Sequence, residues 1–148
     1  MRKFALSAAA LALVTLAVPV LATAADTVRT RVASYRELGA AFKAANDGLR
    51  GEPQIVLLQQ SARQIGNASK QQYAWFPAGS GVGAKTAAKP EIWSNPAGFR
   101  AAQDAFARQA EAFKKAVVSG NAAVMRAEVK KLGAVCKGCH DKFRNKDD

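Results

Sequence analysis

The sequence predicts an all-α domain: an antiparallel four-helix bundle with a long crossover loop between its second and third helices. Four stretches repeat apolar residues with the 3.6-residue period of an α-helix, and no useful length of sequence alternates as a strand does. The helices are joined by short links and one long crossover, and the link of two to three residues between the last two helices forces these to be antiparallel neighbours. The chain of 148 residues suits a single domain.

Residues 1–24 are predicted to be a secretory signal peptide. A short basic start, MRK, precedes an alanine-rich apolar run that ends in ATA, which is typical of cleavage before Ala25 or Asp26. An uncleaved membrane anchor is the alternative, because the run is about long enough to span a bilayer. Pro19 and the small residues at the end favour cleavage. We therefore expect a periplasmic domain of residues 25–148 with no stable membrane insertion.

The charge of the chain bears on its partners. The full sequence carries a net charge of +11, and removal of residues 1–24 leaves +9. Such a surface attracts anionic groups and acidic proteins. The lysines and arginines are scattered, and an exported protein rarely meets nucleic acid, so we expect no nucleic-acid partner. A solvated basic surface is the simplest interpretation.

Two helices are expected before the long connection. The first runs from about Thr27 to Asp47 and ends in the breaker sequence NDGLRGEP. The second starts near Pro53, whose fixed φ suits a first helical turn, and ends near Gln72. Their apolar stripes are Val28, Val32, Tyr35, Leu38, Phe42 and Ala45 in the first helix, and Ile55, Leu58, Ala62 and Ile65 in the second.

The connection from Tyr73 to Asn95 is aperiodic and rich in glycine and proline. A connection of this length inside a compact domain usually has a function or is disordered. Trp75, Phe76 and Trp93 lie toward its two ends and predict a docked segment. Their rings either seal a binding pocket or simply close the core.

Two more helices follow the connection. Asn95 and Pro96 suit the N-cap and first turn of the third helix, and SGN ends that helix at Gly120 and starts the fourth at Asn121. The apolar stripes are Phe99, Ala102, Phe106, Ala110, Phe113 and Val117 in the third helix, and Met125, Val129, Leu132, Cys136, Cys139 and Phe143 in the fourth. The last stripe predicts that the cysteines point inward.

The only two cysteines and the only histidine form one motif, Cys136-x-x-Cys139-His140. A zinc site needs four ligands, and no second cluster completes the set. A thiol redox pair is expected beside a βαβ unit, which this sequence does not predict. Covalent haem attachment uses all three residues, as two thioether bonds and one iron ligand. On a helix they fall within a sector of roughly 100°, so we predict one haem c per chain, with zinc or thiol chemistry as the alternatives.

The sixth coordination position of the iron decides what such a haem does. The chain has no second histidine. Met125 lies about 22 Å from His140 along the same helix, so it cannot reach the opposite face of the haem. Lys43 is the nearest lysine by register, and its use as a ligand requires that it be buried and neutral. We therefore predict five-coordinate, high-spin iron with an open distal side.

The chain resembles the cytochrome c prime (cytochrome c') family, the class II c-type cytochromes. The resemblance spans residues 25–148 and rests on YR in the first helix, on WFPAGSG and KPEIW in the long connection, and on CKGCHDKFR at the end. It implies an exported four-helix bundle in which Cys136 and Cys139 carry the thioether bonds and His140 is the proximal ligand.

The resemblance also implies roles for single positions. It places Arg144 beside the proximal imidazole and pairs Arg36 with a haem propionate. Four residues after this arginine, low-spin relatives carry an iron-binding methionine and high-spin members usually a bulky apolar residue. This chain has Ala40 there. We therefore predict a roomier distal pocket than is usual, unless Phe42 or Leu38 repacks into it.

The function implied is binding of nitric oxide or carbon monoxide, electron transfer, or both. A dedicated low-spin electron carrier and a weak haem peroxidase are the alternatives. Because no general acid or base is expected beside the iron, we do not predict an enzyme. The implied partners are the gas and a redox protein, which would be acidic if it docks on the basic surface. Family members often form homodimers through the first two helices, and the apolar share of the second permits this.

Overall fold

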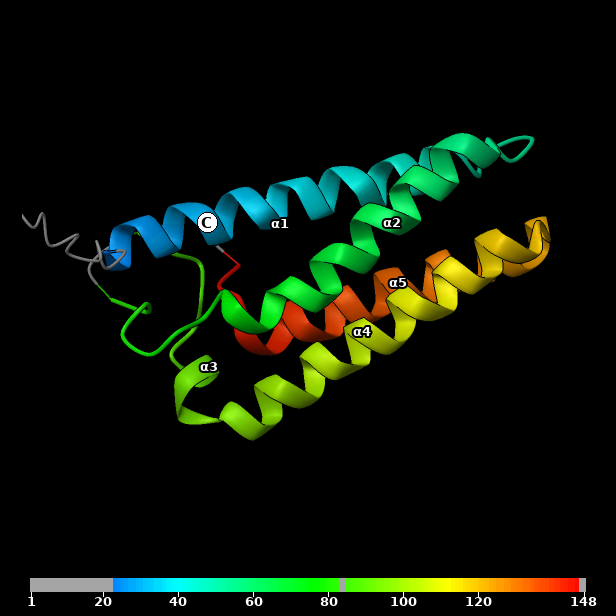
Figure 1. Cartoon of the computed structure of the whole chain (residues 1–148). Coiled ribbons are helices and arrows are strands. Elements are labelled where there is room, and N and C mark those ends of the chain that lie inside the picture. Colours follow the sequence, from blue (N-terminus) through cyan, green and yellow to red (C-terminus); the bar gives the residue numbers. More distant parts are fainter. Residues whose placement is uncertain (1–22, 83–84, 147–148) are drawn as a thin grey trace, which may run out of the picture.

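The computed structural model describes residues 23–82 and 85–146. Four long helices, α1 (Ala24–Asp47), α2 (Ile55–Gln71), α4 (Pro96–Ser119) and α5 (Ala122–Phe143), run in alternating directions (Figure 1). The bundle confirms the predicted fold class. The connection between α2 and α4 is more ordered than its aperiodic sequence predicts, because it contains the short helices η1 (Gln72–Ala74) and α3 (Glu91–Ser94).

Local sequence explains where the long helices begin and end. The Asn95 side chain accepts a hydrogen bond from the backbone N–H of Gly98 at 3.0 Å, and Asn121 caps α5 in the same way. Gly120 separates α4 from α5 in the left-handed conformation, with φ of 69°, which costs glycine little. The predicted signal peptide lies outside the described residues except for Thr23 and Ala24. Thr23 caps α1, so this helix begins three residues before its predicted start.

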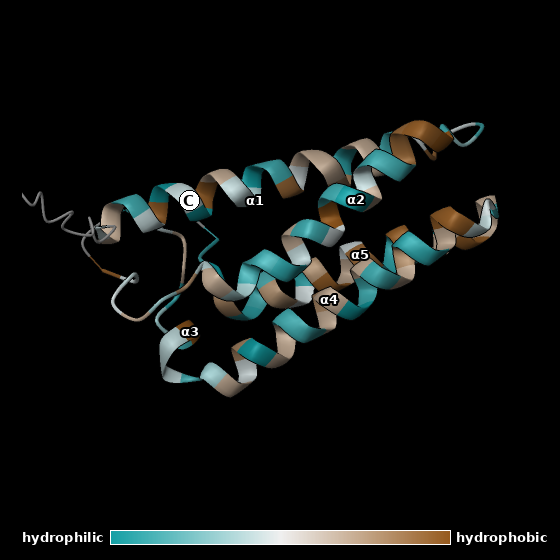
Figure 2. Cartoon of the chain, in the orientation of Figure 1, coloured by the Kyte–Doolittle hydropathy of each residue, from teal (hydrophilic) through white to brown (hydrophobic). Residues whose placement is uncertain are grey.

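Helix pairs enclose one main core. Its buried members come from all four long helices and from Leu49, and hydrophobic residues alternate with hydrophilic ones along each helix (Figure 2). The predicted stripe of the first helix is only half-buried at Val32, Tyr35, Leu38 and Phe42. The predicted stripe of the second helix is wrong at Ile55, which is exposed in the first turn of α2. The largest buried side chains are Phe113, Leu58, Ile65, Met125 and Leu132. The predicted stripe of α5 is buried at Met125, Val129, Leu132 and Phe143, and is half-buried at its two cysteines.

The bundle is least tightly packed between α1 and α5. Among the described residues, α4 packs closely with α5, α2 with α4, and α1 with α2, whereas α1 and α5 are not a closely packed pair. Figure 1 shows α1 meeting α2 beside their connecting turn and diverging from it toward the opposite end. That opposite end holds the last turns of α5 and therefore the Cys-x-x-Cys-His motif. At the turn end, Arg126 of α5 donates to the carbonyl oxygens of Leu49 and Gly51, at 3.1 and 2.6 Å.

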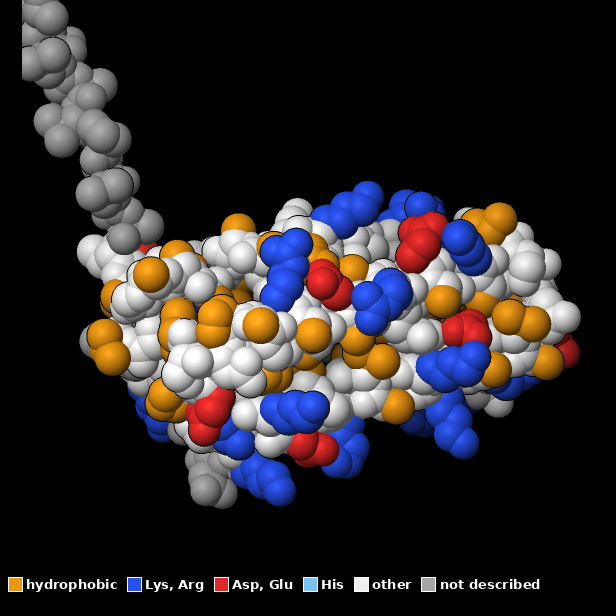
Figure 3. Space-filling view, turned by 90° about the horizontal axis from the view of Figure 1, so that it is seen from below, with side chains coloured by type: hydrophobic (Ala, Val, Ile, Leu, Met, Phe, Trp, Pro, Cys, Tyr) orange, Lys and Arg blue, Asp and Glu red, His pale blue; other side chains and the backbone are white. Residues whose placement is uncertain are grey.

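Charged side chains are scattered over the outside. On the face shown in Figure 3, lysines and arginines are spread over the surface with acidic residues among them. Most of the ion pairs join neighbouring turns of one helix, such as Lys137 with Asp141 and Lys131 with Glu128. Within residues 23–82 and 85–146, no helix has the length and apolar character needed to cross a membrane.

Candidate functional site

The motif lies in the last two turns of α5. Cys136 and Cys139 are half-buried free thiols, whereas the His140 side chain is exposed. Burial raises the pKa of both thiols, so they are protonated at neutral pH. Partial desolvation lowers the pKa of His140, helped by the charge of Arg144, so the imidazole is neutral at neutral pH and able to bind a metal. The prediction that the motif points inward therefore holds in part for the half-buried thiols. It does not hold for His140, which is exposed to solvent.

A group of aromatic rings surrounds the buried side of the motif. Phe76 contacts Phe99 with ring centroids 4.8 Å apart, and Phe99 contacts Phe143 at 5.1 Å. Cys139 packs against the same group, together with Trp93. From α1, Tyr35 meets the Trp75 ring edge-on at 4.8 Å. The predicted docking of the long connection is thus present, and its rings line the end of the bundle that carries the thiols.

Tyr35 is a side chain of α1 that lies near both thiols. Burial raises the pKa of its phenol, and Cys139 and Cys136 act on it electrostatically in the same direction. Further along α1, the Phe42 ring lies against α5 at Gly133, where a Cβ atom would approach Phe42 to 3.1 Å. Tyr35 and Phe42 are therefore the α1 side chains that approach α5, Tyr35 near the thiols and Phe42 near Gly133.

Arg31 is a buried cation at the edge of this site. It is 3% exposed, and no carboxylate pairs with it among the described residues. Its guanidinium donates to the carbonyl oxygens of Trp75 and Ser80 and to the hydroxyls of Ser80 and Thr86. It also lies 4.6 Å from the centre of the Phe76 ring. Burial lowers the pKa of Arg31, because desolvation disfavours the charged form.

The structure does not bring Arg36 or Ala40 into this group. Both are exposed, and Arg36 makes no hydrogen bond or ion pair with the described residues. A 100° rotation per residue explains this, because positions 36 and 40 lie on a different face of α1 from positions 31 and 35. Lys43 also points outward, with its Nζ atom 2.5 Å from Asp47.

The chain end after the motif is tied to the long connection. Ala88 and Arg144 form an antiparallel β-bridge, in which Lys89 donates to the carbonyl oxygen of Phe143 and Asn145 donates to that of Ala87. The Arg144 side chain is exposed, and its charge acts on His140. The backbone around Arg144 thus fixes the aromatic connection to the turn that carries the imidazole.

These residues fit a covalently held haem on three grounds. Two thiols and a neutral imidazole share one end of α5. Helix α1 does not pack closely against α5, and large rings from α1, α4 and the connection line the space beside the thiols. Arg31 offers a buried positive charge that no carboxylate of residues 23–82 and 85–146 pairs with. Met125, which is 0% exposed within the main core, is not available as an iron ligand.

Comparison with known proteins agrees with this site. The family model for cytochrome c' matches residues 26–144. The chain belongs to the cytochrome c' family. A cytochrome c' from Rhodopseudomonas palustris is 36% identical over 124 residues, which cover 82% of this chain and 83% of that protein. The Rubrivivax gelatinosus cytochrome c' is 42% identical over 82 residues, covering 55% of this chain and 64% of its own length.

A solved structure extends the likeness to the whole bundle. The nitric oxide complex of a variant of cytochrome c' from Alcaligenes xylosoxidans superposes with a TM-score of 0.78 at 26% identity, covering 86% of this chain and 99% of that one. Cytochromes c' are haem proteins of the c type, so the predicted family, fold class and cofactor class agree with the comparisons.

Arg31 is not among the site residues predicted from the sequence, although the sequence contains a signal for it. Val28, Arg31, Tyr35 and Leu38 follow one another in alternating steps of three and four, which is the spacing of a single buried helix face. An arginine on such a face is unusual because a buried cation needs partners. Its partners come from the long connection, which periodicity does not describe.

Proposed function

We propose that this chain is an exported cytochrome c' that holds one haem c through thioether bonds at Cys136 and Cys139. His140 is the proximal ligand, the iron is five-coordinate and high-spin, and nitric oxide or carbon monoxide binds on the distal side. The observation that carries the proposal concerns Tyr35, a polar side chain that interacts electrostatically with both thiols: burial raises its pKa, and a protonated phenol is a poor iron ligand. Residues 1–24 would direct the chain to the periplasm.

Each residue around the haem has its own proposed role. The haem supplies an iron that binds diatomic gases and changes oxidation state. The thiols hold it to one face of α5, and the neutral imidazole of His140 offers a nitrogen lone pair to the iron. Arg31 supplies a desolvated cation for a propionate, in addition to Arg36, to which the family resemblance gives that role. Trp75 and Phe76 keep water from the buried side.

Tyr35 is proposed to cover the distal face in place of Ala40. Its ring is bulky, belongs to the face of α1 that is turned to the thiols, and is supported by Trp75 at 4.8 Å. The distal side is then less roomy than Ala40 alone predicts, and a gas must displace the ring to bind. Tyr35→Ala should therefore raise the rate of carbon monoxide binding, while Ala40→Leu should leave it near the wild-type rate.

One experiment tests the main proposal. Optical and electron paramagnetic resonance spectra of the purified ferric protein should show a high-spin haem, and carbon monoxide should shift the optical spectrum of the ferrous protein. The pigment should remain with the chain after acid-acetone extraction. A low-spin spectrum without a response to carbon monoxide would instead indicate a dedicated electron carrier.

Electron transfer is the second candidate, and the exposure of His140 favours it. Because the imidazole faces the border with solvent, a redox partner can approach the proximal side closely. Lys137 and Arg144 lie beside it, so an acidic partner is the better match. Electron exchange that slows with added salt and ignores nitric oxide would select this candidate.

A homodimer through α1 and α2 is also proposed. Ile55 and Val56 are exposed apolar residues, 38% and 77% exposed, in the first turn of α2. They line an open depression together with Gln54, Leu57 and Gln60. Sedimentation of the wild type and of Val56→Glu should show whether this surface joins two copies.

A further inference from the structure

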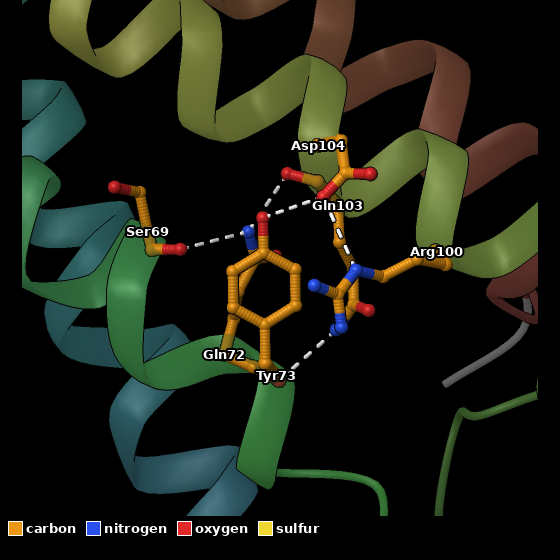
Figure 4. Close-up of polar contacts among 6 residues, drawn as sticks. All are labelled: Ser69, Gln72, Tyr73, Arg100, Gln103 and Asp104. Atoms are coloured by element: carbon orange, nitrogen blue, oxygen red, sulfur yellow. Dashed lines mark hydrogen bonds and ion pairs between the residues drawn. The ribbon is translucent and has the colours of Figure 1, made fainter.

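A second polar group joins the end of α2 to α4, outside the residues that line the candidate haem site. We call it the η1 clamp, and Figure 4 shows how its members face one another. Its members are Ser69, Gln72, Tyr73, Arg100, Gln103 and Asp104. The first belongs to α2, the next two to η1, and the last three to α4.

The inner half of the clamp is a reciprocal pair of amides. The Gln72 Nε2 atom donates to the backbone carbonyl oxygen of Gln103 at 3.0 Å, and the Gln103 Nε2 atom donates to the backbone carbonyl oxygen of Gln72 at 3.1 Å. Gln72 is 3% exposed and Gln103 is 6% exposed. Because a buried amide without its partner is costly, this pair fixes η1 at one position along α4.

The outer half of the clamp locks the Tyr73 ring. The Tyr73 hydroxyl donates to Asp104 Oδ1 at 2.7 Å, and the Nε atom of Arg100 donates to the same oxygen at 3.2 Å. The Arg100 guanidinium also lies 4.1 Å from the centre of the Tyr73 ring. Each of these three side chains therefore holds the other two in place.

One backbone atom, the carbonyl oxygen of Gln72, connects the clamp to the candidate site. The Gln72 carbonyl oxygen accepts from Gln103 and also from the backbone N–H of Trp75, at 3.2 Å. Trp75 in turn presents its ring edge to Tyr35 at 4.8 Å. A continuous line of contacts thus runs from α4 through Gln72 and Trp75 to Tyr35.

We propose that the η1 clamp is a positioning device for the distal side of the haem. It holds Trp75 against Tyr35 and so sets how readily the phenol ring moves aside for a diatomic ligand. The inference rests on the proposed function, in which Tyr35 covers the distal face. The clamp residues themselves are positioning residues, because they act through Trp75. A looser clamp allows more positions of Trp75 and raises the share of molecules whose distal side is open.

The test compares matched variants of the haem-loaded protein. Gln103→Leu removes the buried donor to Gln72, and carbon monoxide should then bind the ferrous protein about fivefold faster, the factor to which the loss of one hydrogen bond of ~1 kcal/mol corresponds. Tyr73→Phe removes only the bond to Asp104, and its rate should rise about twofold. The ferric electron paramagnetic resonance spectrum should change in both variants.

Gln109→Leu is the control, because it makes the same substitution in the same helix. The Gln109 Nε2 atom donates to the carbonyl oxygen and the carboxylate of Glu128, at 3.2 and 2.6 Å, and so joins α4 to α5 away from the connection. This variant should unfold at a lower temperature and keep the wild-type carbon monoxide rate and spectrum.

Equal loss of thermal stability in Gln103→Leu and Gln109→Leu, with wild-type gas binding and spectrum in both, would overturn the inference. If Gln103→Leu does not fold, Tyr73→Phe decides, and an unchanged rate and spectrum in that variant overturn it as well. A wild-type protein that binds no carbon monoxide contradicts the proposed function instead. The clamp is then judged by the electron paramagnetic resonance spectrum alone, and an unchanged spectrum in the variants overturns it.

Discussion

Replacement of Arg31 by methionine tests the most unusual buried group of the structure. The guanidinium makes hydrogen bonds of 3.3, 3.1, 3.2 and 2.9 Å to acceptors in the long connection. Methionine keeps the apolar contact with Phe76 and loses every one of these bonds. Since the bonds join α1 to the connection, their loss frees the connection from the first helix.

The magnitude follows from opposing terms. A hydrogen bond from a charged donor contributes about 1.5–3 kcal/mol to the free energy of unfolding. Four such bonds would together exceed the usual effect of replacing one side chain. Burying a cation costs several kcal/mol, which offsets most of that gain, and the proposed pairing with a haem propionate recovers only part of this cost. We expect Arg31→Met to lower the free energy of unfolding by about 2–3 kcal/mol. Because domains are stable by about 5–15 kcal/mol, the variant should still fold.

The assay is urea unfolding of the haem-loaded protein, followed by far-ultraviolet circular dichroism. Arg36→Met is the control, because Arg36 is exposed and makes no hydrogen bond or ion pair with the described residues. It should change the free energy of unfolding by less than ~0.5 kcal/mol. Equal stabilities of the two variants would refute the reasoning. The reduction potential should also fall in Arg31→Met, because a buried cation disfavours the more positive ferric haem.

Three further predictions concern single residues. Cys139→Ser should leave one thioether bond, so the pigment should still resist acid-acetone extraction while the pyridine haemochrome band moves to longer wavelength; an unmoved band would show that Cys139 makes no bond. The hydrogen bond from Tyr73 lowers the pKa of Asp104 below the usual range of an aspartate. The stability that this bond contributes is therefore complete above that range and is lost as the pH falls through the lowered pKa. Asp104→Asn should therefore flatten the acid side of the stability–pH curve, and an equally steep curve would contradict this. Gly120→Ala should destabilise the bundle by about 1 kcal/mol, purely through its φ of 69°, because a Cβ atom there meets nothing within 4 Å; urea unfolding measures it, and a neutral result would mean that the turn changes conformation.

Interactions between residues close in the sequence are enough to predict the long helices and the geometry of the motif. The Asn95 and Asn121 caps, the glycine between α4 and α5, and the periodic apolar residues depend on neighbours a few positions away, so the sequence predicts them well. The spacing of Cys136, Cys139 and His140 is set by helix geometry alone. The same rules place η1 and α3 poorly, because short helices in an aperiodic connection depend on what they pack against.

What the sequence by itself determined is the bundle, its four long helices and the chemistry of the motif. Only the tertiary structure decided which face of α1 turns toward that motif. Helix periodicity groups Arg31 with Tyr35 and separates both from Arg36 and Ala40, but it does not say which group is buried. That choice depends on the long connection, because its carbonyl and hydroxyl oxygens provide the partners that a desolvated guanidinium requires.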